Sequence, residues 1–428
     1  MIALIFLFLL LASFIFLSFP IAFAIGIASL IVMELLGIPV SVAITHTFRG
    51  IDSFPLMAIP FFILAGEIMG KARVVEQIIN FANSMVGGLR GGLGHVNVVG
   101  SMIFAGISGS GVADASAIGS ITIPSMIKQG YGKDFSVAVN STAATIGPII
   151  PPSIPMILWG TLTGSSIGAL FLGGIIPGLL IGFGLMAMNY VICLKRGYDF
   201  RYGKFSLKRV FVTFFQSLGA LIMPGIIIGG IISGIFTATE AGVVAVIYGF
   251  LFGTLITRAL KLHDIPRLII NAATLSAVVM YIIAMVMIFS NILARLRFME
   301  IFTNKVLSLT QDPTLAVFLI ILLLLFLGCF IDPTALIVMF APTLSAFGER
   351  MGYHPIHFGV LMVIVMLIGA VTPPVGSMLF VSLGIAKIPL EESVVVLYPF
   401  IAVLVIVALI VMFVPPAATW IPTLILGG

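Results

Sequence analysis

The sequence predicts an all-α polytopic membrane protein, and three observations support that fold class. The chain of 428 residues is 61% hydrophobic and only 8% charged, whereas soluble domains carry roughly 25% charged residues. Apolar stretches of about 20 residues, the length that crosses a bilayer as a helix, recur along the chain. Four of the longer stretches are interrupted near their middles by Gly, Pro, Ser or Asp. The interruptions predict helices that break inside the membrane.

About ten apolar stretches are expected to cross the membrane. In the first half they are 2–19, 21–44, 53–70, 136–164 and 170–194; in the second half they are 214–236, 239–256, 268–293, 357–385 and 394–415. The first stretch follows no charged segment and precedes no A-x-A cleavage site. We therefore interpret it as a membrane span and not as a signal peptide.

Two further apolar stretches, 96–127 and 314–348, are interrupted by SGSGVADAS and IDPTA. We interpret each as a re-entrant hairpin that enters and leaves the membrane on the same side. Each half of the chain then has one order: three spans, a polar amphipathic arm (71–92 or 295–312), a hairpin, a broken span and a whole span. Five crossings per half is an odd number, so the halves have opposite orientations, which predicts an inverted repeat.

The basic residues indicate how the chain is inserted. With this topology, fifteen of the 20 Lys and Arg residues fall on one side of the membrane. The other five are Arg49, Arg295, Arg297, Lys305 and Arg350. Loops rich in Lys and Arg stay in the cytoplasm, so both termini are expected on the outer side. The same distribution accounts for an isoelectric point near 9.3, and no nucleic-acid partner is expected.

Each broken span contains a glycine followed by two adjacent prolines, in GPIIPPSIP (147–155) and GAVTPPVGS (369–377). Proline removes a backbone donor and disfavours helix at the residue before it. Carbonyl oxygens are thereby freed in the hydrocarbon, where they need protein, water or an ion as partner. A cation can supply that partner. The candidate carbonyl ligands are those of Gly147, Ile150, Pro151, Gly369 and Pro373.

The hairpin tips and the second break add side-chain oxygens. Oxygen ligands alone suit a hard monovalent cation such as Na⁺, and the N-termini of half-helices attract an anionic substrate. We therefore interpret the chain as a secondary transporter with Na⁺ as its coupling ion and no organic cofactor. The candidate side-chain ligands are Ser108, Ser110, Asp114, Asp332, Thr334 and Thr372.

Several of these residues also have structural interpretations. Asp114 and Asp332 are suited to cap half-helices, which does not exclude ion binding. Ser108 and Ser110 are suited to hydrogen-bond their own backbone. Glu240 falls at a tight outer turn between two expected spans, where a helix cap or an interface residue is expected rather than a substrate ligand.

Five motifs resemble the large membrane subunit of the TRAP transporters, the tripartite ATP-independent periplasmic family. They are SGSGVADASAIGS (108–120), GPIIPPSIP, FTATEAG (236–242), IDPTALI and GAVTPPVGS, and the likeness covers nearly the whole chain. The resemblance implies Na⁺-driven uptake of a carboxylate-bearing solute, such as a C4-dicarboxylate or sialic acid, across a bacterial inner membrane. It also implies two partners, a periplasmic substrate-binding protein and a small four-helix membrane subunit. No four-span extension precedes residue 1, so a separate small subunit is expected.

The resemblance further implies an elevator mechanism of the kind found in ion-transporter-like folds. Transport elements at 96–194 and 314–415 would move against scaffold spans at 1–70 and 214–293. The remaining expected segments are a cytoplasmic arm at 71–95, a basic linker at 195–213, a periplasmic-side arm at 294–313 and a periplasmic C-terminal tail at 416–428. The substrate carboxylate is expected between the two hairpin tips, near Ser110, Gly111, Ser153, Pro333, Thr334 and Gly376.

Two other functions are weighed against this one. A standalone Na⁺- or H⁺-coupled carboxylate or ion transporter would share the inverted-repeat design but would need no binding protein. The string GISG at 106–109 matches the short motif around the serine of rhomboid-type intramembrane proteases, which need a histidine base beside that serine. All five histidines are expected in loops or arms, so the chain is not expected to be an enzyme. They are His46, His95, His263, His354 and His357.

Overall fold

The structure, a computed structural model, describes residues 2–17, 19–201 and 206–427, and every regular element among them is a helix. Residues 202–205 of the expected basic linker, including Lys204, lie outside the described residues. By length and composition, six helical segments can each cross a membrane, which confirms a polytopic membrane protein. They are Phe54–Lys71, Ile167–Lys195, Leu207–Ile232, Ala238–Ile256, Leu262–Arg295 and Leu390–Phe413. The other expected crossings fall on shorter helices.

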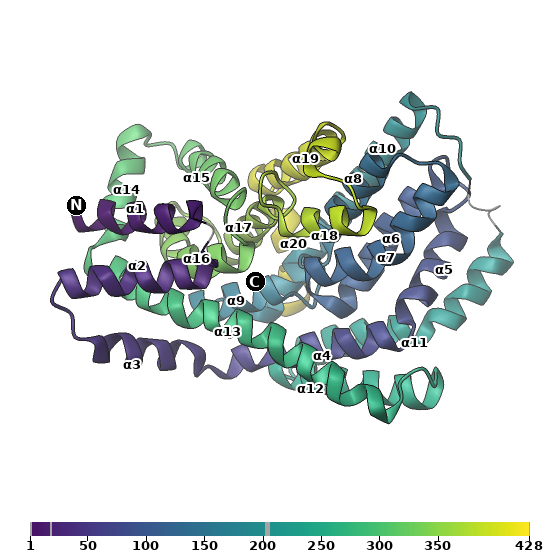
Figure 1. The fold of residues 1–428 in the computed structure, drawn as a ribbon, viewed down its shortest axis with the longest axis horizontal. Coiled ribbons are helices and arrows are strands. Elements are labelled where there is room, and N and C mark those ends of the chain that lie inside the picture. The colour runs from purple at the N-terminus through teal and green to yellow at the C-terminus, as the bar shows by residue number, and fades with distance from the viewer. Residues whose placement is uncertain (1, 18, 202–205, 428) are drawn as a thin grey trace.

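The first half of the chain contains ten α-helices and two short 3₁₀ turns (Figure 1). In order they are α1 (Ile2–Phe16), α2 (Ile21–Leu35), α3 (Val40–Ile51), η1 (Phe54–Met57), α4 (Ala58–Lys71), α5 (Val74–Val86), α6 (Gly92–Ser108), α7 (Gly111–Gln129), α8 (Lys133–Ala143), η2 (Ala144–Ile146), α9 (Ile154–Thr163) and α10 (Ile167–Lys195).

The second half repeats this order. It contains α11 (Leu207–Ile232), α12 (Ala238–Leu251), the π-helical η3 (Phe252–Ile256), η4 (Leu262–Asp264), α13 (Ile265–Arg295), α14 (Phe298–Leu309), α15 (Pro313–Gly328), α16 (Pro333–Arg350), α17 (Pro355–Gly369), α18 (Ser377–Ala386), α19 (Leu390–Phe413) and α20 (Pro416–Leu426). Both expected hairpins (α6–α7 and α15–α16) and both broken spans (α8–α9 and α17–α18) are present. The residues expected as a C-terminal tail form α20, which packs against α10.

The expected bounds of the span at 21–44 are wrong, because the segment is not one continuous helix. Helix α2 ends at Leu35, Gly37 adopts a left-handed φ of 64°, and Pro39 precedes the separate helix α3. Glycine in this conformation ends helices, and proline does not extend the preceding one. Together α3, η1 and α4 take the place in the first half that the long α13 takes in the second, and α13 packs beside both α3 and α4 (Figure 1).

Matching links connect α4 to α5 in the first half and α13 to α14 in the second. Arg73, between α4 and α5, has a φ of 59°, and Arg297, between α13 and α14, has a φ of 51°. A non-glycine residue in the left-handed region is uncommon, so the same rare turn at the same place in both halves supports an internal repeat. Helices α5 and α14 follow at once, within the segments expected as arms.

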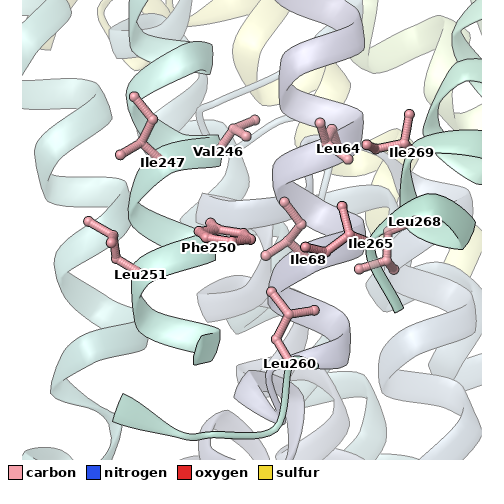
Figure 2. Close-up of a pocket in the computed structure, with 10 residues that line it drawn as sticks. All are labelled: Leu64, Ile68, Val246, Ile247, Phe250, Leu251, Leu260, Ile265, Leu268 and Ile269. Carbon is pink, nitrogen blue, oxygen red and sulfur yellow. The ribbon is translucent and has the colours of Figure 1, made fainter. Parts of the chain in front are cut away.

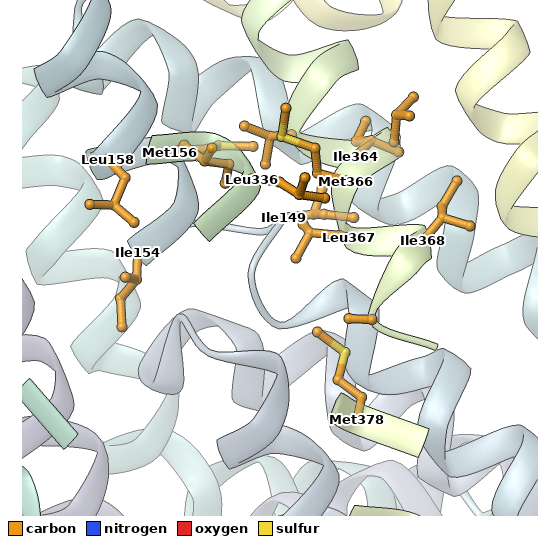
Figure 3. Close-up of a cluster of buried hydrophobic side chains, with 14 of the residues drawn as sticks. Ile149, Ile154, Met156, Leu158, Leu336, Ile364, Met366, Leu367, Ile368 and Met378 are labelled. Carbon is orange, nitrogen blue, oxygen red and sulfur yellow. The ribbon is translucent and has the colours of Figure 1, made fainter. Parts of the chain in front are cut away.

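The hairpins and broken helices of the two halves interlock. Helix α7 of the first hairpin packs against α18 of the second broken helix, and α16 of the second hairpin packs against α9 of the first. Figure 3 shows the apolar cluster at this junction. Its labelled side chains are Ile149, Ile154, Met156, Leu158, Leu336, Ile364, Met366, Leu367, Ile368 and Met378. The four elements therefore share one core to which both halves contribute.

Glu240 caps α12, as one interpretation of the sequence predicted. Its Oε2 accepts a hydrogen bond from the Thr237 backbone N at 2.7 Å, and its own backbone N donates to Thr237 Oγ1 at 3.3 Å. This reciprocal capping box satisfies two donors at a helix start. In this structure the carboxylate of Glu240 is engaged by the turn at the start of its own helix.

Candidate functional site

The first hairpin tip touches the first break through the backbone. Helix α6 ends at Ser108, Gly109 follows with a φ of 58°, and the Gly109 carbonyl accepts a hydrogen bond from the backbone N of Ile154 at 3.2 Å. A Cβ on Gly109 would lie 2.6 Å from the carbonyl oxygen of Pro152. Glycine is needed here both for the positive φ and for the close approach.

The second tip meets the second break in the same way. The carbonyl of Cys329, just after α15, accepts a hydrogen bond from the backbone N of Val375 at 3.1 Å. Gly328 and Gly369 come so close that a Cβ on Gly369 would lie 2.5 Å from the Gly328 Cα. In both halves, therefore, the hairpin tip is placed on the break of its own half.

The breaks leave backbone oxygens unpaired. Within the described part of the chain, the carbonyls of Gly147, Ile150 and Pro151 accept no hydrogen bond, and neither does the Pro373 carbonyl. The Gly369 carbonyl differs, since it accepts from the backbone N of Thr372 at 3.0 Å. Buried carbonyls are nearly always paired in native structures, so the unpaired carbonyls at the first break could accept an ion or a water molecule.

Asp114 brings a carboxylate to that place. It lies in the first turn of α7 and is fully buried. Its Oδ1 accepts a hydrogen bond from Ser101 Oγ at 3.1 Å, while Oδ2 has no partner among the described residues. A Cβ on Gly147 would lie 3.0 Å from this Oδ2. A buried carboxylate is costly unless it is paired, and a cation between Asp114 and the first break would pair it.

Asp114 and Asp332 differ in whether they cap a helix. Ser110, not Asp114, caps α7, because its Oγ accepts from the backbone N of Ala113 at 3.5 Å. Asp332 does cap α16, because its Oδ1 accepts from the backbone N of Thr334 at 2.9 Å. Asp332 is partly exposed. The structure therefore gives Asp332 a capping partner and leaves Asp114 with a free oxygen.

The remaining candidate hydroxyls differ in what they bind. Ser108 Oγ is buried and has no partner among the described residues. Thr372 Oγ1 donates to the Ile368 carbonyl at 2.7 Å. Ser153 Oγ donates to the Pro148 carbonyl and accepts from the backbone N of Met156, which caps α9. Ser108 therefore offers a buried hydroxyl without a partner among the described residues, and like Asp114 it lies in the first hairpin.

The expected substrate region is partly assembled across the two halves. Gly111, the first residue of α7, lies against Met378, which is two residues after Gly376, and a Cβ on Gly111 would lie 2.0 Å from Met378 Cε. In the other hairpin, Pro333 is buried as the first residue of α16, and Thr334 follows it. The start of α7 therefore lies beside α18 of the opposite half, and α16 as a whole packs against α9.

A buried polar network beneath the first tip escaped the sequence analysis. Asn97 Nδ2 donates to Thr122 Oγ1 at 2.6 Å and to Asn140 Oδ1 at 2.9 Å. Asn140 Nδ2 donates to the Ala115 carbonyl at 3.0 Å and to Ser382 Oγ at 2.8 Å. The network joins the first hairpin to α8 and to α18 of the other half. The sequence held one signal of a buried polar face on α6. Asn97 and Ser101, which bonds Asp114, are four residues apart and so lie on the same face of that helix.

Asn140→Ala is expected to destabilise the protein by about 3 kcal/mol, because it removes three buried hydrogen bonds at about 1 kcal/mol each. Thermal unfolding of the purified protein in detergent measures the effect. Asn304→Ala, at an exposed position on α14, is the matched control and is expected within about 0.5 kcal/mol of the parent protein. Equal stability of the two variants would contradict a structural role for the network.

The expectation that all five histidines lie in loops or arms is wrong. His95 and His357 are buried in the first turns of α6 and α17. Their Nε2 atoms contact the carbonyls of Arg90 at 3.1 Å and Val411 at 2.7 Å. Neither pairs with Ser108, whose hydroxyl has no partner among the described residues. The serine–base pair that a protease requires is not formed in the described part of the chain.

Comparison with known proteins gives one consistent result. The profile of the family described as "Tripartite ATP-independent periplasmic transporter, DctM component" matches residues 8–417. The isethionate TRAP transporter permease protein DctMQ of Oleidesulfovibrio alaskensis is 40% identical over 94% of this chain, and the chain spans 64% of that protein. The sialic acid TRAP transporter large permease SiaM of Vibrio cholerae is 38% identical, with 96% of each covered. The C4-dicarboxylate TRAP transporter large permease DctM of Rhodobacter capsulatus is 33% identical over 95% of this chain and 96% of that protein.

Proposed function

This chain belongs to the tripartite ATP-independent periplasmic transporter family, DctM component, and on that premise we propose that it is the large permease subunit of a binding-protein-dependent secondary transporter. Its named relatives are permeases, and the chain is not an enzyme. The proposed substrate is an organic acid. The three relatives are named for isethionate, sialic acid and C4-dicarboxylates, all of which carry an acidic group.

The single observation that carries the mechanism is the unpaired oxygen of Asp114. This Oδ2 lies beside Gly147 of the first break, whose carbonyl accepts no hydrogen bond, and the partnerless Ser108 hydroxyl belongs to the same hairpin. Oxygen ligands from a carboxylate, a hydroxyl and backbone carbonyls suit a hard cation. We propose that Na⁺ binds here as the coupling ion, and that Asp332 and the second break provide a corresponding place in the other half.

Ion binding would prepare the transport elements for movement. An unpaired carboxylate is costly to carry past an apolar scaffold, so only the loaded form would move easily. The hairpins and broken helices interlock through α7 with α18 and α16 with α9, which supports their movement as one body. An elevator motion of these elements against α1–α4 and α11–α13 is the proposed route of alternating access.

The proposed partners are a small four-helix membrane subunit and a periplasmic binding protein that delivers the organic acid. With both termini outside, the protein would lie in the bacterial inner membrane with α14 near the periplasmic surface. A standalone Na⁺- or H⁺-coupled carrier of similar design is the alternative. It differs in one measurable respect, because it would transport substrate without a binding protein.

The substrate class and the coupling ion are tested together in cells that lack other uptake systems for these acids. The chain, its small subunit and its binding protein are co-expressed, and uptake of labelled sialic acid, succinate and isethionate is measured in Na⁺ or in choline buffer. We expect uptake of one organic acid that depends on Na⁺. Equal uptake in both buffers would contradict Na⁺ coupling.

A further inference from the structure

A cavity of about 250 Å³ lies between α4, α12 and α13 (Figure 2). Figure 2 shows the side chains that line it. They are Leu64, Ile68, Val246, Ile247, Phe250, Leu251, Leu260, Ile265, Leu268 and Ile269. Every one of these side chains is a hydrocarbon, and Ile247, Leu251 and Ile269 at its margin are about half exposed. The cavity is therefore apolar and partly open to the surface of the helices.

Hydrocarbon is a better occupant of this cavity than water. A buried water needs two to four polar partners, and the lining side chains offer none. All three helices belong to segments that can span a membrane, so an opening among their exposed apolar side chains suits contact with lipid. An empty cavity of this kind loses dispersion contacts on its walls. A dry apolar cavity of about 150 Å³ holds a benzene-sized guest, so a cavity of about 250 Å³ has room for part of an acyl chain.

Positive charge is concentrated beside one end of the cavity. Leu260 and Leu268 of the lining lie in a short segment, 258–268, that also contains Arg258, Lys261 and Arg267. These three basic residues are exposed and form no ion pair in the described part of the chain. They lie on the side expected to be cytoplasmic.

The nearby carboxylates are already engaged. Asp264 accepts an ion pair from Lys71 at 3.1 Å, and its Oδ1 also lies 3.6 Å from His263 Nε2. Glu67, on α4 beside the lining residue Ile68, accepts a hydrogen bond from Asn271 Nδ2 at 3.4 Å. Asn271 is neutral, so Glu67 keeps its charge, but three basic residues without an ion pair outnumber this one carboxylate. The net charge at this end of the cavity is therefore positive.

We propose that this cavity and the three basic residues form a binding site for an anionic phospholipid. One acyl chain occupies the space between α4, α12 and α13, and the phosphate of the headgroup lies near Arg258, Lys261 and Arg267. Basic groups next to a hydrophobic cavity between membrane helices suit anionic lipid headgroups. The bound lipid contacts helices from both halves of the expected scaffold, and these contacts would stabilise the packing of the scaffold helices.

Native mass spectrometry of the full chain tests the site with two lipids that have the same acyl chains, phosphatidylglycerol and phosphatidylethanolamine. The triple variant R258Q/K261Q/R267Q is expected to lose affinity for phosphatidylglycerol by about a hundredfold, at roughly fivefold for each basic residue. Its matched control is K128Q/K133Q/K195Q, which removes three exposed lysines elsewhere on the chain. A second variant, V246F, fills the cavity and is expected to reduce binding of both lipids, with V395F at an exposed position as its control.

Three results would overturn the proposal. One is an unchanged preference for phosphatidylglycerol in the triple variant, and another is unchanged binding of both lipids to V246F. The third is loss of the bound lipid when the small membrane subunit associates, together with cross-links from that subunit to Ile247 or Leu251. That result would identify the cavity as part of a protein interface.

Discussion

Asp114→Ala is expected to raise the Na⁺ concentration needed for half-maximal uptake by at least about tenfold, while the protein still folds. The carboxylate is buried and its Oδ2 has no partner among the described residues. Removing it deletes a charged ligand, and interactions with a charged group contribute about 1.5–3 kcal/mol, which corresponds to tenfold or more in affinity. Folding is preserved because only the hydrogen bond from Ser101 is lost. The measurement is initial uptake into proteoliposomes over a series of Na⁺ concentrations.

Two variants accompany that experiment. Asp134→Ala removes a carboxylate that pairs with Arg196 at 2.8 Å near the membrane surface, and its Na⁺ dependence should match the parent protein. Asp332→Ala is expected to weaken Na⁺ dependence in the second half, although it also removes the cap of α16. If Na⁺ activation were unchanged in both the Asp114 and the Asp332 variants, the proposed ion sites would be wrong.

Gly369→Ala is expected to reduce uptake at least about tenfold and to lower stability by about 1–3 kcal/mol, the usual effect of overpacking. The new methyl group would lie 2.5 Å from the Gly328 Cα and 2.7 Å from its carbonyl oxygen. Both are backbone atoms, so neither moves without shifting the second hairpin. That shift would also strain the hydrogen bond from Val375 to Cys329. Uptake and thermal unfolding are measured on the same preparation.

Gly384→Ala is the matched control, since this glycine lies on α18 close to the second break in sequence and has no atom within 4 Å of a new Cβ. Alanine in a helix is favoured over glycine by about 0.5–1 kcal/mol, so this variant should be as stable as the parent protein or more so. Equal loss of uptake in both glycine variants would contradict a specific role in transport for the contact between Gly328 and Gly369.

Much of the fold follows from the sequence because membrane helices are defined by length and apolarity. The hairpins and broken spans were predicted because Gly, Pro and Asp interrupt apolar runs, and the structure has all four. The predicted bounds 21–44 were wrong because the first residues of α3 are apolar and resemble a continuation of α2. Gly37 and Pro39 were the available signals for its separation.

The site was less predictable, because local sequence does not show which polar groups are already paired. Asp332 precedes Pro333, a pattern typical of a helix cap, and it does cap α16. Asp114 has no such signal, and only the structure shows that Ser110 takes the capping position. The link from Asn140 to Ser382 joins residues 242 positions apart, a separation that no local pattern reveals.

The most direct test of the account is uptake of the labelled organic acid into proteoliposomes that contain this chain and its small membrane subunit. An inward Na⁺ gradient is imposed, and the cognate periplasmic binding protein is either added or left out. We predict uptake only when both the Na⁺ gradient and the binding protein are present. Na⁺-driven uptake at the same rate without the binding protein would contradict the account and identify a standalone carrier.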